Sequence, residues 1–186
     1  MPFEFLPTRL DGLIEIRPRR FGDDRGWFAE TYKQSDFRGA GIEGPFVQDN
    51  HSLSALGTVR GLHYQLPPHA QGKLVRVVSG KAWDVAVDIR RGSPTFADWY
   101  GLELTGESGN MLWIPPGFAH GFLALSDETH LVYKCTAEYD KASERAIRWD
   151  DANLAIDWPR LPREGEYLLS EKDAQAPSWD KAEECG

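Results

Sequence analysis

Short apolar stretches separated by glycine-containing turns recur along the chain from Leu13 to Ala137. Each stretch spans about five to eight residues and is rich in Val, Ile, Trp and Tyr, which favour extended backbone. Helical spacing of apolar residues is largely absent from this region. The pattern therefore predicts an all-β sandwich or barrel. The expected strands are Leu13–Arg17, Trp27–Tyr32, Phe46–Ser52, Leu74–Val78, Ala82–Ile89, Trp99–Leu104, Met111–Ile114, Gly121–Leu125 and His130–Cys135.

Helices are expected only as short peripheral elements. The segment Ser35–Ala40 predicts one or two turns, and Ala152–Ile156 and Asp173–Glu184 are the other candidates. The closely spaced prolines at 159 and 162 resist both helix and central strand, so they predict a transition from the barrel to a C-terminal helical cover over residues 160–186.

The expected central strands carry apolar residues on both faces. In Ala82–Ile89, one face carries Trp83, Val85, Val87 and Ile89, and the other carries Asp84, Ala86 and Asp88. A barrel has one interior and one exterior, so an apolar exterior indicates a second sheet or a subunit partner as cover.

Length and charge narrow the class of protein. A chain of 186 residues predicts a single domain, residues 1–186. The net charge of -8 argues against a nucleic-acid surface. No segment approaches the roughly 20 apolar residues of a membrane-spanning helix, and the acidic start does not resemble a signal peptide. Cys135 and Cys185 are too few for a disulfide framework. We therefore expect a soluble protein of the reducing cytoplasm.

Two glycine-bounded patterns between Gly57 and His120 have the spacing of the metal-binding motifs of cupin barrels. Such sites generally use three histidines and a glutamate, whereas only His63 and His120 stand at ligand positions here. Lys73 lies near the expected glutamate, and a protonated lysine repels a cation. The patterns predict a cupin-type jelly roll, a double-stranded β-helix barrel, without a metal or other cofactor. A metal-dependent cupin enzyme remains an alternative.

His63 lies in a short extended stretch, Arg60 to Gln65. If this strand is regular, Arg60, Leu62 and Tyr64 share one face, and Gly61, His63 and Gln65 share the other. A lone histidine in a strand is commonly a hydrogen-bonded core residue. An imidazole also titrates close to neutral pH, which suits a general base.

Seven short motifs follow one another in order along the chain. They are Phe21-x-Asp23-Asp24-Arg25-Gly26-x-Phe28-x-Glu30, Gln48-Asp49-Asn50-x-Ser52, Arg60-Gly61-Leu62-His63-Tyr64-Gln65, Lys73-Leu74-Val75-Arg76, Ile114-Pro115-Pro116-Gly117-Phe118-Ala119-His120-Gly121-Phe122, Tyr133-Lys134-Cys135-Thr136-x-x-Tyr139 and Ser170-x-Lys172-Asp173. In this order the motifs resemble those of the dTDP-4-dehydrorhamnose 3,5-epimerase family. The resemblance spans most of the chain, from Leu13 to about Pro177.

The resemblance implies epimerisation at C3 and C5 of dTDP-4-dehydro-6-deoxy-D-glucose, which gives dTDP-4-dehydro-L-rhamnose for dTDP-L-rhamnose biosynthesis. The 4-keto group already acidifies its neighbouring carbons, so the protein must add a base, an acid on the opposite face and a group that stabilises the enolate oxygen. A mono-epimerase that acts at only one carbon of another dTDP-4-ketosugar would share these residues, and the sequence does not separate the two activities.

The resemblance assigns catalytic roles to four residues. It implies that His63 is the base, that Asp173 orients it, that Tyr133 is the acid and that Lys73 stabilises charge on the keto oxygen. Asp84, on the adjacent expected strand, is either a counter-ion for Lys73 or a solvated strand carboxylate.

The resemblance also implies a substrate-binding set, with Tyr139 stacked on the thymine ring and basic groups at the diphosphate. The set is Arg25, Glu30, Gln48, Asp49, Asn50, Arg60, Lys73, His120, Tyr139, Glu144 and Lys172. His51 and His69 lie near these motifs without an assigned role.

A homodimer is a further implication of the resemblance. In the family, N-terminal strands cross to the neighbouring subunit, so Arg25 and Glu30 are expected to serve the partner's site. The expected ligand is a dTDP-4-keto-6-deoxyhexose, and neither nucleic acid nor membrane is an expected partner.

Overall fold

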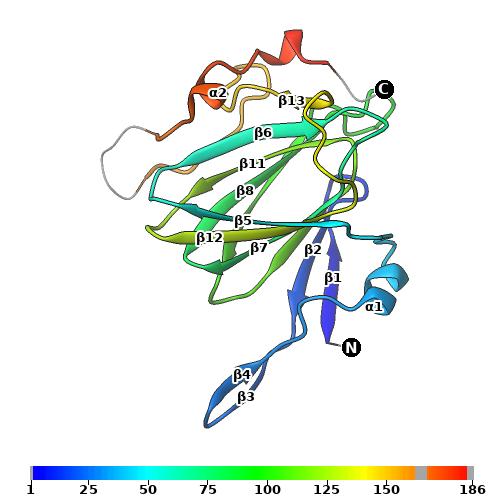
Figure 1. The fold of residues 1–186 in the computed structure, drawn as a ribbon, viewed down its shortest axis with the longest axis vertical. Helices are drawn as coiled ribbons and strands as arrows, with labels where there is room; N and C mark the ends of the chain where they lie inside the picture. Colours follow the sequence, from blue (N-terminus) through cyan, green and yellow to red (C-terminus); the bar gives the residue numbers. More distant parts are fainter. Residues whose placement is uncertain (1, 162–166, 184–186) are drawn as a thin grey trace.

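The computed structural model describes residues 2–161 and 167–183 of the chain. Two antiparallel sheets face each other and form a jelly-roll barrel (Figure 1). The predicted all-β, jelly-roll class is therefore confirmed. The first sheet has six strands in the order β1 (Phe3–Pro7), β2 (Ile14–Pro18), β10 (Met111–Ile114), β7 (Lys73–Ser79), β12 (Thr129–Cys135) and β5 (Gln48–Ser54).

The second sheet and a few peripheral elements complete the described chain. This sheet has five strands in the order β13 (Glu144–Ala146), β6 (Val59–Gln65), β11 (Phe118–Ala124), β8 (Lys81–Asp88) and β9 (Trp99–Thr105). The strands β3 (Phe21–Asp23) and β4 (Gly26–Phe28) form a hairpin that projects from the barrel (Figure 1). The helical elements are α1 (Gln34–Gly39), α2 (Glu171–Ala174) and the 3₁₀ turn η1 (Trp179–Lys181).

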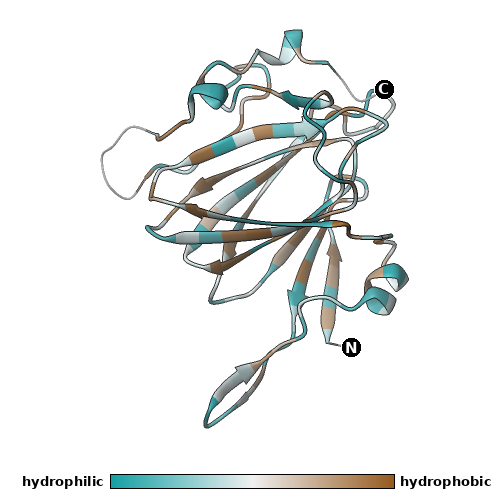
Figure 2. Cartoon of the chain, in the orientation of Figure 1, coloured by the Kyte–Doolittle hydropathy of each residue, from teal (hydrophilic) through white to brown (hydrophobic). Residues whose placement is uncertain are grey.

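Apolar residues are concentrated on the strands, and both helices are largely hydrophilic (Figure 2). One core lies between the two sheets and includes Val75, Val77, Ala86, Leu112 and Leu131. A second core covers the outer face of the five-stranded sheet, and the C-terminal segment supplies Trp158 and Trp179 to it. A third core covers part of the outer face of the six-stranded sheet, where α1 contributes the fully buried Phe37. The N- and C-terminal segments of the chain thus cover much of the apolar outer faces that the sequence pattern predicted.

The strand β6 contains one more residue than its partner over the same stretch. His63 pairs with His120 and Arg60 pairs with Phe122, so the register shifts by one residue between these pairs. Gly61, within this shift, has a φ of +118°. A Cβ at Gly61 would lie 2.6 Å from the Cα of Gly121. The regular alternation expected here, which placed Arg60 and His63 on opposite faces of the strand, is therefore wrong. Both side chains line the same pocket.

The observed strands coincide with most of the predicted ones, but three predicted segments are wrong in part. The strand expected over Trp27–Tyr32 ends at Phe28, after which Tyr32 packs on the ring of Phe37. Residues 152–155 form turns rather than a helix, because the Asp151 carboxylate accepts hydrogen bonds from the backbone N–H groups of residues 153 and 154.

The expected helix Asp173–Glu184 is divided in the structure. The helix α2 ends at Ala174 and the separate turn η1 begins at Trp179, with Pro177 between them. Proline has no N–H to continue a helical ladder, so a continuous helix is disfavoured there. Glu184 and Cys185 lie outside the described residues, as do several residues of the expected C-terminal cover. Within the described ranges, no helix is long and apolar enough to cross a membrane.

We expect the substitution Gly61→Ala to lower the free energy of unfolding by about 2–4 kcal/mol. Overpacking typically costs about 1–3 kcal/mol, and a positive φ adds strain for any residue with a Cβ. Chemical denaturation monitored by tryptophan fluorescence measures the change. Gly92→Ala is the matched control, because a Cβ there has nothing within 4 Å, and it should alter stability by less than about 0.5 kcal/mol. Equal stability of the two variants would contradict the close strand approach.

Candidate active site

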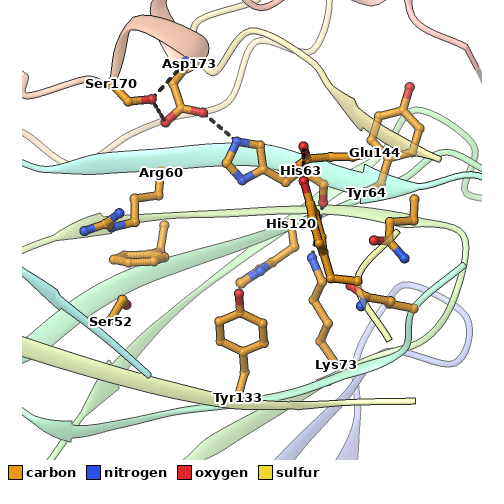
Figure 3. A pocket seen from close by; sticks show the side chains of 14 residues that line it. Ser52, Arg60, His63, Tyr64, Lys73, His120, Tyr133, Glu144, Ser170 and Asp173 are labelled. Carbon is orange, nitrogen blue, oxygen red and sulfur yellow. Dashed lines mark hydrogen bonds and ion pairs between the residues drawn. The ribbon is translucent and has the colours of Figure 1, made fainter. Parts of the chain in front are cut away.

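A polar pocket opens between the two sheets, and Figure 3 shows side chains from both sheets converging on it. Lys73 on β7 and Tyr133 on β12 enter from the six-stranded sheet. His63 on β6 and His120 on β11 enter from the five-stranded sheet. The remaining lining residues are Ser52, Arg60, Tyr64, Gln65, Gln71, Phe122, Tyr139, Glu144, Ser170 and Asp173.

A carboxylate–histidine pair lies at one side of the pocket. The Nε2 atom of His63 is 2.5 Å from Oδ1 of Asp173, which is 4% exposed. Ser170 Oγ donates to the other carboxylate oxygen at 2.8 Å and accepts from the Asp173 backbone N–H at 3.1 Å, so it caps α2. Burial disfavours the charged carboxylate, but hydrogen bonds from His63, Ser170 and the Gly61 backbone lower the pKa of Asp173 overall. Asp173 is therefore a charged acceptor for the imidazole.

The C-terminal segment reaches the pocket because it is hydrogen-bonded beside the start of β6. Thr58 and Leu168 form a parallel bridge, and the backbone N–H of Val59 donates to the Leu168 carbonyl at 2.9 Å. The Leu168 N–H donates in turn to the Gly57 carbonyl oxygen at 2.9 Å. This contact brings Asp173 to His63 across 110 positions of sequence.

Lys73 is a buried amine at the pocket floor. Its side chain emerges from the interior face of β7, and Nζ donates to the His63 carbonyl oxygen at 3.4 Å. Burial lowers the pKa of Lys73, while Cys135, Asp84 and Glu144 oppose that shift in this order. In its protonated form, Lys73 offers a positive charge that bulk water screens little.

Tyr133 faces Lys73 and His120 inside the barrel (Figure 3). Burial is the main cause of its raised pKa, with Cys135 and Glu144 acting in the same direction and Arg60 opposing them. The ring centroids of Tyr133 and His120 are 6.4 Å apart. The raised pKa keeps the phenol protonated near neutral pH, so this group can donate a proton.

Asp84 is not a solvated carboxylate, and that alternative was wrong. The side chain is fully buried on β8, and its Oδ1 and Oδ2 atoms lie 2.8 and 3.1 Å from Nε2 of His120. Its electrostatic influence on Lys73 is also present, although the contact that Asp84 makes is with His120. Two carboxylate–histidine pairs therefore border one pocket.

Four of the expected binding residues gather near the pocket mouth. Arg60 Nε donates to Ser54 Oγ at 3.1 Å, which holds the guanidinium against β5. Glu144 joins two of the others: the Tyr139 hydroxyl donates to its Oε2 at 3.0 Å, and Lys172 Nζ lies 2.5 Å from its Oε1. The Tyr139 side chain is half exposed, which leaves its ring available to a ligand.

Other expected binding residues lie away from this pocket. Arg25 is at the tip of the projecting hairpin, where it pairs with Asp23 at 2.5 Å, and Glu30 follows the same hairpin. Asp49 pairs instead with Lys134 at 2.9 Å and borders a different cavity. The remaining pair, Gln48 and Asn50, is linked by a 3.0 Å hydrogen bond, and the Gln48 Oε1 atom accepts from the Tyr139 backbone N–H at 2.7 Å.

Several lining residues were missed by sequence reasoning, including Ser52, Tyr64, Gln71, Phe122 and Ser170. A signal for Ser170 was present, because serine three positions before an acidic residue is a common helix cap. The lining position of Phe122 follows from alternation with His120, but the sequence alone does not say which face is internal.

The remaining histidines and Cys135 lie outside the lining of the pocket. His51 Nε2 is 2.9 Å from His130 Nδ1, and His69 is exposed. Cys135 is buried and free, and it accepts a weak hydrogen bond from Asn50 at 3.5 Å. Over the part of the chain that the structure describes, no group of three His, Cys, Asp or Glu side chains could hold a metal ion.

Taken together, the pocket combines an oriented imidazole, a protonated phenol and a buried lysine amine. Such a set can remove a proton from carbon, stabilise the resulting anion and return a proton from another direction.

Comparison with known proteins identifies relatives of this chain. Residues 7–181 match the family model described as dTDP-4-dehydrorhamnose 3,5-epimerase. A protein of that name from Sinorhizobium fredii is 52% identical over 164 residues, which cover 88% of this chain and 83% of the relative.

Two solved structures have the same fold. The 3,5-epimerase of Legionella pneumophila in complex with dTDP-4-keto-L-rhamnose is 46% identical with a TM-score of 0.90, over 96% of this chain and 94% of the other. A 3′-monoepimerase from Streptomyces bikiniensis in complex with dTDP-quinovose is 35% identical with a TM-score of 0.86, over 93% and 86%. The sequence resemblance is thereby confirmed, and the chain belongs to the dTDP-4-dehydrorhamnose 3,5-epimerase family.

Proposed function

We propose that this protein epimerises C3 and C5 of dTDP-4-dehydro-6-deoxy-D-glucose and forms dTDP-4-dehydro-L-rhamnose, in the cytoplasm, for dTDP-L-rhamnose biosynthesis. Membership of the family supports the substrate class. The observation that carries the reaction type is the placement of an oriented histidine and a protonated tyrosine on opposite sheets of one pocket. Epimerisation requires this opposition, because the proton must leave one face of the carbon and return to the other.

In the proposed mechanism His63 is the base and Asp173 is its support. His63 Nε2 is bonded to Asp173, so Nδ1 takes the proton from the carbon beside the keto group. The electron pair of the broken C–H bond becomes the enolate, whose oxygen carries the negative charge. Lys73 stabilises that charge from the pocket floor, and Asp173 stabilises the imidazolium that has formed.

Tyr133 then completes each inversion as the acid. The phenol donates its proton to the opposite face of the carbon, and the carbonyl is restored. This step leaves a tyrosinate and an imidazolium, so His63 must lose a proton and Tyr133 must regain one before the second carbon is inverted and again before the next turnover. The His63 side chain is 31% exposed at the pocket mouth, which supports proton release to water.

Substrate binding is proposed for the groups around the mouth. Arg60, which lines the pocket, and Lys172, which pairs with the lining residue Glu144, are suited to the diphosphate. The exposed ring of Tyr139 is suited to stacking on the thymine. Glu144 holds Tyr139 and Lys172 in place through hydrogen bonds on both carboxylate oxygens. His120, which lines the pocket, and Gln48, Asp49 and Asn50, which do not, are proposed as further contributors.

We also propose that residues 1–186 act as one domain that assembles as a homodimer. The projecting hairpin supports this: Phe21, Trp27 and Phe28 are 48%, 60% and 66% exposed. Large apolar side chains on an extended arm favour a protein partner. A second copy that buried this arm would receive Arg25 and Glu30 near its pocket.

The proposed function is tested by incubation with dTDP-4-dehydro-6-deoxyglucose in deuterated water. The protein should form product that a 4-ketoreductase specific for the L-configured sugar consumes, with deuterium at both C3 and C5 by NMR. We expect His63→Ala to reduce turnover about 10²- to 10⁴-fold, because general-base catalysis is lost. His69→Ala is the control, since this exposed histidine lies outside the pocket.

Two results would contradict this assignment. Full turnover by His63→Ala would remove the proposed base. Deuterium at only one carbon would replace double epimerisation by mono-epimerisation, an activity that the S. bikiniensis relative carries by name.

We expect Tyr133→Phe to suppress epimerised product more than proton exchange. Removal of the proton by His63 does not need the phenol, whereas return from the opposite face does. Deuterium incorporation into recovered substrate and the yield of L-configured product, measured in one reaction, give the two rates. Equal loss of both rates would exclude Tyr133 as the acid.

A further inference from the structure

A second carboxylate–histidine pair lies at the pocket floor, and it takes no part in the proposed proton transfers. Asp84 on β8 is fully buried, and His120 on β11 is 6% exposed. In the antiparallel register Asp84 lies opposite Phe122, and His120 lies opposite Ala86. Asp84 and His120 are therefore diagonal neighbours on the interior face, and two hydrogen-bonded strands fix their contact.

The partner of Asp84 accounts for its burial. A buried carboxylate without a hydrogen-bond donor is costly, and both oxygens of Asp84 lie within hydrogen-bond distance of His120 Nε2, at 2.8 and 3.1 Å.

The direction of the contact follows from the chemistry of the two groups. An ionised carboxylate only accepts hydrogen bonds, so Nε2 of His120 donates to Asp84 and carries a proton. A ring whose single proton is held on Nε2 has an unprotonated Nδ1, which can accept a hydrogen bond.

The two pairs also differ in access to water. The His63 side chain is 31% exposed, whereas that of His120 is 7% exposed. The more exposed ring, that of His63, is suited to repeated proton exchange with water. The enclosed ring of His120 is suited to a hydrogen bond of fixed direction.

We propose that Asp84 is a positioning residue that holds the single ring proton of His120 on Nε2, so that Nδ1 accepts a hydrogen bond from a hydroxyl group of the sugar. This inference rests on the proposed function for its substrate, but its tautomer can be measured without one. His120 thereby selects a sugar that offers a hydroxyl donor at the pocket floor.

The test compares Asp84→Asn with the wild-type protein. An amide retains the shape of the carboxylate, removes its charge and can donate to Nε2, which moves the ring proton to Nδ1. Nδ1 of His120 then donates a hydrogen bond at the position where it accepts one in the wild-type protein. We expect kcat/KM to fall at least about 10²-fold, since a comparable change of tautomer in a Ser-His-Asp triad lowers turnover even more.

A matched control separates this contact from the burial of any carboxylate on β8. Asp88→Asn is that control: Asp88 is also fully buried on β8, but it bonds Arg90, Ser93 and Thr95 outside the pocket. The ring proton of His120 should stay on Nε2 in Asp88→Asn, and kcat/KM should fall less than in Asp84→Asn.

Nitrogen-15 NMR of histidine-labelled protein separates this inference from the proposed function. Wild-type His120, assigned by comparison with His120→Gln, should show a protonated Nε2 and an unprotonated Nδ1 without added substrate. This measurement also stands if Asp84→Asn fails to fold. A proton on Nδ1 in the wild type or an unmoved ring proton in Asp84→Asn would overturn the inference, even where the wild-type enzyme is active.

Discussion

The backbone contact between β6 and β11 at Gly61 and Gly121 is the constraint on which the site depends. A Cβ at Gly121 would lie 2.8 Å from the Arg60 carbonyl oxygen, so the two strands meet where neither carries a side chain. The extra residue that β6 accommodates there turns Arg60 and His63 toward the same pocket. The same register sets His63 directly opposite His120, which gives adjacent strands one carboxylate-bound imidazole each.

Burial then gives the ionisable groups of the pocket their separate properties. Cores on the outer faces of both sheets limit the routes by which water can reach the interior. The same low-dielectric environment lowers the pKa of Lys73 and raises that of Tyr133, because burial disfavours whichever form is charged. Nearby acidic groups oppose the effect of burial on Lys73, while burial keeps the proton on Tyr133. One barrel interior therefore acts in opposite directions on the pKa values of Lys73 and of Tyr133.

Much of the fold could be predicted because alternation is a local property: the predicted strand Met111–Ile114 has the observed bounds, and most others differ by a few residues. The order of motifs likewise indicated most of the pocket's chemical groups. The bulge in β6 was not predictable from alternation, since it depends on a contact with a distant glycine. The preference of Asp84 for His120 over Lys73 required the register of β8 and β11. The division of the last predicted helix had a visible cause in Pro177.

The orienting carboxylate of the proposed base belongs to a segment that follows every strand of the barrel in the chain. During synthesis, β6 and β12 are made well before α2, so His63 and Tyr133 precede Asp173 on the ribosome. Closure of the barrel and formation of the His63–Asp173 pair are consequently separate events during folding. A newly made chain whose last segment has not yet docked beside Thr58 contains base, acid and lysine without the group that steadies the imidazolium. Docking of that segment is the step by which a folded barrel becomes a competent catalyst.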